Sequence, residues 1–386
     1  MSKICIFASH YLPYLGGIER YTYNLAKALQ KLGDEVLVVT NNDMKLKNVE
    51  IMDGIRVLRL PCYNFMGGRY PVMKYNREFR ELYGKLKKEN FDLVLINARF
   101  YPHTLLGAWL AKRKKTRSII LDHGTSHMTV GRKLPDLIFA AVEHGLTIGD
   151  KLLCKEYFGV SKACCRWLGH FKIQAKGVLY NAVDAENIRE LAEHPVRNFR
   201  EEYGVSEDTL AIVYTGRLIK EKGIFKLIQA VKSMDNKYKV ILFVAGDGEE
   251  SEAVRQMEDQ RVKLLGRLEF PQIAALLGQA QIYCLPTEYP EGFPTSVLEA
   301  AAAGCYVITT DRGGSKELIE DESCGTILKT VTAESIKNAL EKIAAAPAER
   351  ELAAQKAKEK VNRRFTWDMT AEKVHNLAEE GKRRWK

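Results

Sequence analysis

Short apolar runs alternate with longer amphipathic segments along the first half of the chain. The expected strands of this half are Lys3–Ser9, Glu35–Asn41, Ile55–Leu60, Asp92–Asn97 and Ser118–Asp122. The expected helices between them are Tyr21–Leu32, which Gly33 ends, Asn76–Asn90 and Thr104–Lys114. Short apolar strands that alternate with helices predict a parallel sheet covered by helices on both faces.

The same pattern restarts after residues 177–184. The expected strands are Leu210–Tyr214, Val240–Ala245, Val262–Leu265, Gln281–Pro286 and Tyr306–Thr310. The expected helices are Ile224–Met234, Gln272–Gln279 and Pro294–Ala303, and the tail from Ala333 onward is helical by composition. We therefore expect two Rossmann-like, doubly wound α/β domains, residues 1–180 and 181–367, with a C-terminal helix at about 368–386 that crosses back to the first domain. Such domains bind ligands outside the carboxyl ends of their strands, which predicts a site in a cleft between the two.

Composition favours a globular protein of a reducing compartment. Hydrophobic residues make up 46% and charged residues 28% of the 386 residues, and no apolar run approaches the ~20 residues that cross a bilayer. The first residues read as a strand and not as a signal peptide. The eight cysteines include no C-x-x-C pair, so we expect them neither to bind zinc nor to have a redox function. A cytoplasmic location follows from these features.

The net charge is unevenly distributed. Residues 1–180 contain 29 lysines and arginines against 15 acidic residues, whereas the remainder contains 30 against 34. A basic half suits an anionic partner, such as nucleic acid, an acidic lipid surface or a phosphorylated substrate, although it is equally compatible with a solvated surface. Nucleic acid is disfavoured because the chain has no helix-turn-helix, RNP or zinc-finger signature.

The segment from Pro290 to Ala300 carries the clearest chemical signal. Pro294 fits the first turn of a helix, where its missing N–H costs nothing, and the amides of Thr295, Ser296 and Val297 would then face a ligand. A helix start of this kind is a ready phosphate site. Glu291 in the preceding loop and Glu299 inside the helix are suited to accept hydrogen bonds from sugar hydroxyls. The alternative is an ordinary helix with a surface glutamate at each end.

Two further segments place backbone and cations at strand ends. Gly16 and Gly17 join the first strand to the first helix, where glycines let a diphosphate approach the backbone, although a plain turn has the same sequence. Gly216, Arg217 and Lys222 follow the first strand of the second half. Cations there can neutralise the charge of a leaving diphosphate. A surface ion pair between Arg217 and Glu221 is the competing interpretation.

His123 ends an apolar strand of the first half, where a histidine can serve a ligand or cap a loop, and His127 is a weaker alternative. Gly246 follows the strand Val240–Ala245, and Arg267 follows Val262–Leu265. Arg267 can stack on a base or lie on the surface. The chain lacks a D-x-D pair of metal-chelating aspartates, a G-x-x-x-x-G-K-[ST] loop and a G-x-S-x-G elbow.

The segment Glu291-Gly292-Phe293-Pro294 through Glu299-Ala300 resembles the E-G-F-P-x-x-x-L-E-A signature of family-4 retaining glycosyltransferases, which have the GT-B fold. Other motifs of that family recur in order from about residue 5 to residue 320, among them the glycine pair, G-R-x-x-x-x-K-G at 216–223 and the strand-end histidine. The resemblance implies metal-independent transfer of a hexose-type sugar from a UDP- or GDP-linked donor, with no other cofactor.

The resemblance also implies roles for the site residues. Glu291 and His123 would contact the transferred sugar, and Glu299 would hold the ribose. Arg217, Lys222 and the amides at Gly17 and Thr295 would stabilise the departing diphosphate. The remaining residues expected to line the donor pocket are Gly16, Gly216, Gly246, Arg267, Phe293, Pro294 and Ser296. The turn at Gly313-Gly314 is expected to shape the pocket wall.

The acceptor is expected from the first half, and here the sequence is less specific. Basic clusters at 85–88 and 112–117 and an aromatic, loop-like stretch at 62–75 fit a peripheral contact with anionic membrane on the inner face of the plasma membrane. A glycan or lipid-diphosphate-linked acceptor in bacterial cell-surface polysaccharide or glycolipid synthesis is the implied partner. A nucleotide-sugar epimerase or a phosphorylase on the same fold and a basic nucleic-acid-binding protein are the alternatives. The sequence leaves the oligomeric state open.

Overall fold

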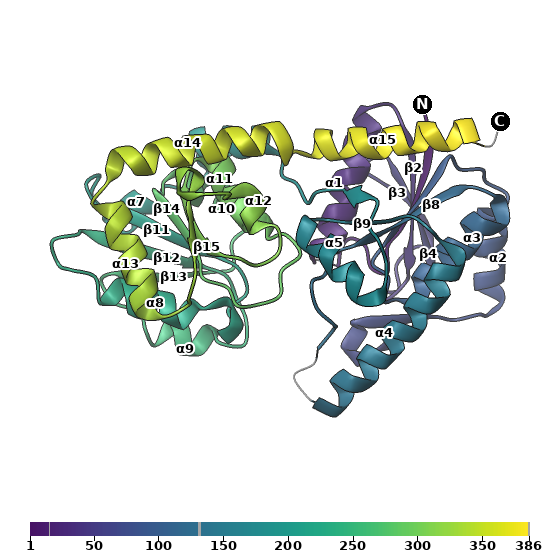
Figure 1. Cartoon of the computed structure of the whole chain (residues 1–386), viewed down its shortest axis with the longest axis horizontal. Coiled ribbons are helices and arrows are strands. Elements are labelled where there is room, and N and C mark those ends of the chain that lie inside the picture. Colours follow the sequence, from purple (N-terminus) through teal and green to yellow (C-terminus); the bar gives the residue numbers. More distant parts are fainter. Residues whose placement is uncertain (15, 130–132, 385–386) are drawn as a thin grey trace. The chain divides into compact units, whose positions relative to one another are not determined.

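The structure of the protein is a computed structural model that describes residues 1–14, 16–129 and 133–384 (Figure 1). It divides into an N-terminal unit, Met1–Asn181 with Trp367–Lys386, and a C-terminal unit, Ala182–Thr366. Leu15 of the predicted glycine loop and the last two residues of the predicted helix 368–386 lie outside the described residues.

The main sheet of the N-terminal unit has the order β10-β9-β8-β7-β1-β2-β4-β3, and only β3 runs antiparallel to its neighbour. Its strands are β1 Lys3–Phe7, β2 Glu35–Asn41, β3 Val49–Met52, β4 Ile55–Leu60, β7 Leu93–Asn97, β8 Arg117–Asp122, β9 Tyr157–Gly159 and β10 Gly177–Val178. Every residue of β7 is buried, as expected for a strand covered on both faces. The order reverses between β1 and β7.

Helices cover both faces of this sheet. On one face α1 packs against α15, and on the other α3 packs against β1, β7, β8 and the long helix α4. The helices are α1 Gly17–Lys31, α2 Arg77–Leu86, α3 Pro102–Lys114, α4 Lys133–Leu153, α5 Lys162–Leu168 and α15 Trp367–Arg384, with short 3-10 turns η1 Met66–Gly68 and η2 Gly169–Phe171.

The C-terminal unit contains a fully parallel sheet of order β13-β12-β11-β14-β15-β16. Numbered along the chain, this is the 3-2-1-4-5-6 order of a doubly wound fold. Its strands are β11 Leu210–Thr215, β12 Val240–Ala245, β13 Val262–Gly266, β14 Ile282–Leu285, β15 Tyr306–Thr310 and β16 Thr326–Leu328.

Helices of the C-terminal unit form a layer on each side of its sheet (Figure 1). One layer packs α6, α10, α11 and α14 together, and the other packs α8 against α13. The helices are α6 Ala185–Glu193, α7 Phe199–Glu202, α8 Ile224–Lys232, α9 Ser251–Arg255, α10 Phe270–Gly278, α11 Thr295–Ala303, α12 Ser315–Leu318, α13 Ala333–Ala344 and α14 Pro347–Arg364, with turns η3 Lys220–Lys222 and η4 Glu322–Cys324.

The predicted α/β class with two doubly wound halves is confirmed, but three local predictions need correction. The stretch 62–75, expected as a loop, forms the hairpin of β5 Cys62–Phe65 and β6 Tyr70–Met73. Helix α4 was not expected, because it buries Glu143, Thr147 and Asp150 and exposes many of its apolar side chains. Helix α11 begins at Thr295, so that Pro294 is its N-cap and not a residue of its first turn. All eight cysteines are free thiols.

Among the helices of the described residues, none combines the length with the apolar character that a bilayer span requires.

Candidate functional site

The carboxyl ends of β11 and β14 mark the switch point of the C-terminal sheet, because the strand order reverses between these two neighbours. Doubly wound sheets bind ligands outside the strand ends at such a point. The loop after β11 carries Gly216, Arg217 and Lys222, and the loop after β14 carries Glu291. The structure therefore brings together the residues that the sequence places at two separate strand ends.

Lys222 and Glu291 form an ion pair between these loops. The Lys222 Nζ lies 2.9 Å from Glu291 Oε1, and each side chain is 13% exposed. The Thr287 hydroxyl lies 3.5 Å from the same carboxylate oxygen. Because the pair is largely buried, the attraction between its members is weakly screened, and each partner holds the other's loop in place.

Tyr289 lies beneath both cations of the site, and the sequence reasoning missed it. Its ring centroid is 5.4 Å from the Arg217 guanidinium carbon and 5.9 Å from Lys222 Nζ. Its backbone N–H donates to Thr287 Oγ1 over 3.1 Å and to the Glu221 carbonyl over 3.1 Å. An aromatic face attracts a cation within about 6 Å. The sequence feature that could have identified Tyr289 as a site residue is its position two residues before Glu291.

Glycines allow the loops of the site to touch through their backbones. Gly246, at φ +155°, would place a Cβ 1.9 Å from the Gly216 carbonyl oxygen, and Gly223, at φ +75°, would place one 2.2 Å from the Pro286 oxygen. The Gly246 N–H donates to the Gly266 carbonyl over 2.8 Å. Any side chain at Gly246 or Gly223 would push these loops apart.

The first turn of α11 faces the same edge. Its first two amides, those of Thr295 and Ser296, have no acceptor inside the helix by geometry. The third amide, that of Val297, donates to the Pro294 carbonyl over 3.2 Å, so it is not available to a ligand as the sequence suggested. Two amides and the positive end of the helix dipole remain as the anion-binding elements here.

The turn at Gly313-Gly314 fixes the backbone in front of α11. A Cβ on Gly313 would lie 2.6 Å from the Glu291 carbonyl oxygen, and one on Gly314 would lie 2.5 Å from the Phe293 ring. Phe293 is buried and packs edge-on against Phe365 at 5.2 Å. Phe293 thus anchors the segment in the core and is not itself presented at the strand ends.

Both glutamates of the motif act on one buried hydroxyl. Burial is the main reason that the pKa of Tyr283 lies well above its ordinary value, and the charges of Glu299 and Glu291 raise it further. The Ser296 side chain hydrogen-bonds the same phenol and opposes that rise. Glu299, Glu291 and Ser296 therefore lie within electrostatic or hydrogen-bonding reach of Tyr283, at one end of the sheet.

Arg267 is exposed just beyond β13. The pKa of the neighbouring Asp247 is lowered chiefly by the Ser251 hydroxyl, then by the Gly248 N–H, and the Arg267 charge adds to both. Arg267 thus lies near the turn that follows β12, where its exposed side chain fits either the stacking or the surface interpretation.

The glycine pair of the N-terminal unit differs from its expected geometry. Gly16 is the extended N-cap of α1, and a Cβ there would lie 2.3 Å from Glu19 Oε2. A Cβ on Gly17 would meet no atom of the described residues within 4 Å. Glu19 is 5% exposed, and burial raises its pKa. A carboxylate thus lies against Gly16, where the sequence suggested phosphate oxygens, and a diphosphate role for these glycines stays a prediction.

His123 follows β8 and its Nε2 lies 2.9 Å from Asn97 Oδ1. The Asn97 amide nitrogen donates to Thr22 Oγ1 over 2.9 Å, so its oxygen faces the imidazole as an acceptor. The ring then carries its proton on Nε2 and keeps a lone pair on Nδ1. Burial lowers the pKa of His123 to about 3, which keeps the ring neutral. His127, the weaker alternative, pairs instead with Glu143 at 2.7 Å.

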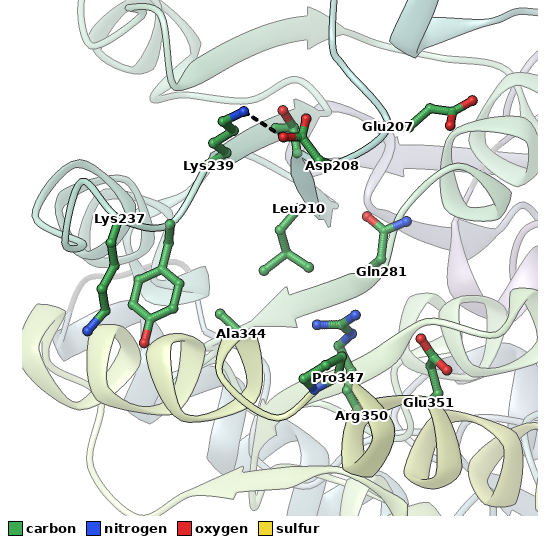
Figure 2. Close-up of a pocket in the computed structure, with 12 residues that line it drawn as sticks. Glu207, Asp208, Leu210, Lys237, Lys239, Gln281, Ala344, Pro347, Arg350 and Glu351 are labelled. Carbon is green, nitrogen blue, oxygen red and sulfur yellow. Dashed lines mark hydrogen bonds and ion pairs between the residues drawn. The ribbon is translucent and has the colours of Figure 1, made fainter.

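A hollow of about 530 Å³ lies at the opposite edge of the C-terminal sheet (Figure 2). Its lining includes Leu210, the first residue of β11, and Gln281, which precedes β14, together with Lys239, Pro347 and Arg350. Because these are the amino ends of the parallel strands, the hollow is separate from the switch-point site.

Comparison with known proteins gives matches over both halves of the chain. Residues 15–187 match the family described as Glycosyltransferase Family 4, and residues 195–360 match the family described as Glycosyl transferases group 1. An uncharacterised glycosyltransferase of Methanocaldococcus jannaschii is 25% identical over 392 residues, 98% of this chain and 98% of its own. One component of the human phosphatidylinositol N-acetylglucosaminyltransferase is 24% identical over 83% of this chain and 64% of its own length.

Solved structures share the fold at low sequence identity. Sucrose-phosphate synthase from Thermosynechococcus elongatus superposes with a TM-score of 0.75 at 19% identity, over 98% of this chain and 99% of its own. The Anabaena protein HepE in complex with UDP superposes with a TM-score of 0.74 at 18% identity, over 98% and 100%. The GT-B fold expected from the motifs is confirmed.

Proposed function

This chain belongs to the group 1 glycosyl transferases of glycosyltransferase family 4, and we propose that it moves a hexose-type sugar from a nucleoside-diphosphate sugar to a glycan or lipid-linked acceptor, with retention of configuration. The observation that carries the proposal is the ion pair of Lys222 and Glu291 at the switch point. Its ammonium suits a phosphate and its carboxylate suits a sugar hydroxyl, so one ligand with both groups satisfies the two partners.

The donor's diphosphate is held by cations and amides. Lys222 exchanges its carboxylate partner for a phosphate oxygen, and Arg217 adds a forked guanidinium that matches phosphate geometry. The Thr295 and Ser296 amides at the start of α11 complete the anion site. These groups stabilise the charge that develops on the leaving diphosphate. Fixed cations in this position supply what a metal ion supplies elsewhere, so we propose metal-independent transfer.

The rest of the donor is assigned to neighbouring groups. Glu291, once released from Lys222, accepts hydrogen bonds from the transferred sugar, and Glu299 accepts them from the ribose. Gly216 and Gly246 leave room for the ligand beside the strand ends, and Arg267 stacks on the base. His123 serves the reacting sugar through the lone pair on Nδ1. HepE is a solved structure with UDP, which supports a UDP-linked donor ahead of a GDP-linked one.

An apolar face of the N-terminal unit supports a lipid-linked acceptor at a membrane. Helix α4 exposes Leu134, Leu137, Ile138, Val142, Ile148 and Leu152 at helical spacing while its buried side is polar. This is the reverse of a normal amphipathic helix, and its N-terminal end projects away from the sheet of its unit (Figure 1). Apolar residues flanked by lysines are the composition of an interfacial helix on anionic lipid. The human relative is named after phosphatidylinositol, which is a phospholipid.

The transfer reaction is tested with a panel of nucleotide sugars and a lipid extract as acceptor source. Release of nucleoside diphosphate that depends on the acceptor, with the labelled sugar recovered in the lipid or glycan fraction, supports the proposal. Conversion of the sugar with donor alone and no diphosphate release would indicate an epimerase. No consumption of any donor of the panel with any extract would contradict the proposal.

The membrane contact is tested separately by flotation with vesicles of anionic and of neutral phospholipid. We expect the wild type to float with anionic vesicles. The double variant Leu137→Glu/Ile148→Glu should remain at the bottom of the gradient. Leu352→Glu is the matched control, because Leu352 is an exposed leucine of α14 in the C-terminal unit. Equal flotation of all three proteins, or none by the wild type, would remove α4 as a membrane contact.

A further inference from the structure

Three histidines of the N-terminal unit converge at one point outside the site described above. His127 lies in the loop after β8, His144 lies on α4, and His170 lies in the turn η2. One ring nitrogen of each lies within 4.8 Å of those of the other two. His144 and His170 are exposed, so the cluster is open to solvent.

The spacing of the nitrogens is that of ligands on a single ion. His170 Nε2 is 3.1 Å from His127 Nε2 and 3.2 Å from His144 Nε2. Two nitrogens on a tetrahedral zinc, each at ~2.0–2.1 Å from the metal, lie about 3.3 Å apart. Two of the three separations therefore need almost no adjustment, and a small side-chain rotation closes the third.

Hydrogen bonds alone account poorly for this arrangement. A contact between two Nε2 atoms needs a proton on one and a lone pair on the other, and His170 Nε2 makes two such contacts with a single proton at most. Protonating all the rings would place like charges together. Neutral imidazoles with converging lone pairs are metal ligands.

A buried network already orients one ligand. His127 Nδ1 lies 2.7 Å from Glu143 Oε2, and Glu143 Oε1 lies 2.6 Å from an Nη of Arg99. Glu143 is 4% and Arg99 1% exposed. Since the carboxylate accepts the proton of Nδ1, the lone pair of His127 is left on Nε2, facing the other two rings. A carboxylate behind a metal-bound histidine is the usual outer partner of zinc sites.

Trp167 fixes a second ring. It stacks on His170 with ring centroids 4.8 Å apart and planes 4° from parallel. Together with Glu143, Trp167 limits the rotation of two of the three imidazoles. The loss of side-chain entropy when an ion binds is therefore small.

We propose that His127, His144 and His170 bind a divalent transition metal ion, zinc being the best fit, through their Nε2 atoms. Glu143 is the outer partner of His127, and a water molecule takes the fourth position on the solvent side. Imidazole ligands favour zinc, copper and nickel over magnesium and calcium, which take oxygen. The ion links the loop after β8 to α4 and η2, and therefore positions the loop that begins at His123.

The proposed metal site takes no part in holding the donor's diphosphate. The metal-independent expectation concerns the donor's diphosphate, which Arg217 and Lys222 hold in the C-terminal unit. A bound ion in the N-terminal unit acts on the geometry of the loop after β8, and its presence can be measured without any activity.

The test is a zinc titration of the full-length, untagged protein after removal of metal with a chelator. We expect one zinc per chain by a colorimetric chelator competition, a rise in Tm with zinc, and an intense visible spectrum with cobalt, as tetrahedral sites give. His144→Ala and His170→Ala should each weaken zinc binding at least 10-fold. Both residues are exposed, so circular dichroism is expected to show intact folds.

His194→Ala is the matched control, because His194 is an exposed histidine of the C-terminal unit. It should bind zinc like the wild type. The proposal is overturned if the wild type takes up less than one zinc per chain at micromolar metal, or if the double variant His144→Ala/His170→Ala still binds one with unchanged affinity.

Discussion

The ammonium of Lys222 lies 2.9 Å from a carboxylate oxygen of Glu291, and each of these side chains is 13% exposed. They come from the loops after β11 and β14, the neighbours between which the order of the C-terminal sheet reverses. A buried charge is tolerated only while it keeps a partner. A ligand that supplies a phosphate to one residue and a hydroxyl to the other can therefore open the pair without leaving either charge alone.

Glu291→Gln separates the two roles of the pair. The change removes the partner of Lys222, so a free nucleoside diphosphate no longer competes with a carboxylate for the ammonium. We expect unchanged or tighter binding of UDP by calorimetry together with turnover reduced by about 10²-fold or more, because the sugar hydroxyls lose the charged carboxylate that accepts their hydrogen bonds. Weaker UDP binding by the variant, with the fold intact, would contradict this account.

Tyr289 is expected to act through its ring and not through its hydroxyl. Removing the aromatic face in Tyr289→Ala takes away cation–π attraction of about 0.5–1 kcal/mol, and with it the support of Arg217. KM for the donor should rise several-fold. Tyr289→Phe keeps the ring and should behave like the wild type in the same assay. A loss of equal size in both variants would show that the phenol oxygen matters instead.

Gly246 and Gly17 make a matched pair for backbone strain. A methyl group on Gly246 would fall 1.9 Å from the Gly216 oxygen, at a φ of +155°, whereas within the part of the chain that the structure describes one on Gly17 meets no atom within 4 Å. Gly246→Ala should lower Tm by several degrees, since strain of about 1–3 kcal/mol is added at one residue. Gly17→Ala should leave Tm unchanged. Equal Tm values for the two variants would mean that the backbones of the loops after β11 and β12 are not in close contact.

Asp150 predicts a pH dependence of stability. Burial raises its pKa to about 8, against the attraction of Arg99, and among the described residues neither of its carboxyl oxygens has a hydrogen-bond partner. The folded protein keeps this proton up to about pH 8, whereas the unfolded chain releases it near pH 4. The free energy of unfolding should therefore fall with rising pH in this window, by up to about 1.4 kcal/mol per unit from this residue.

Asp150→Asn removes this contribution. In urea denaturation, the variant should gain stability relative to the wild type as the pH rises from 5 to 8, and the two should converge at the acid end. A constant difference across the range would show that Asp150 is already ionised in the folded state.

Most strands of both sheets, and the helices that alternate with them, were predictable because they obey a simple rule of burial. The short strands β3, β9, β10 and β16 were not predicted. Strands such as Val240–Ala245 are buried on both faces and read as unbroken apolar runs. The clustering of Arg217, Lys222 and Glu291 also followed from the sequence, since parallel strands bring their carboxyl ends to one edge of the sheet.

The parts that escaped prediction depend on contacts between distant segments. Helix α4 reverses the usual burial of its faces, because Glu143 is paired with the buried Arg99, and no pattern within the helix reveals that partner. In the sequence Tyr289 is an ordinary loop residue, because the two cations that lie over its ring come from another loop. The histidine cluster is invisible in the sequence for the same reason, since its members come from a loop, a helix and a 3-10 turn.

The central claim, that the loops after β11 and β14 bind a nucleoside diphosphate, is tested most directly by equilibrium binding of UDP and GDP to matched variants. We predict that one of the two binds the wild type and that Arg217→Ala and Lys222→Ala each weaken binding at least 10-fold. Lys220→Ala, which changes a 75% exposed lysine of the same loop, should bind like the wild type. Failure of the wild type to bind either nucleotide, or equal binding by all four proteins, would contradict the claim.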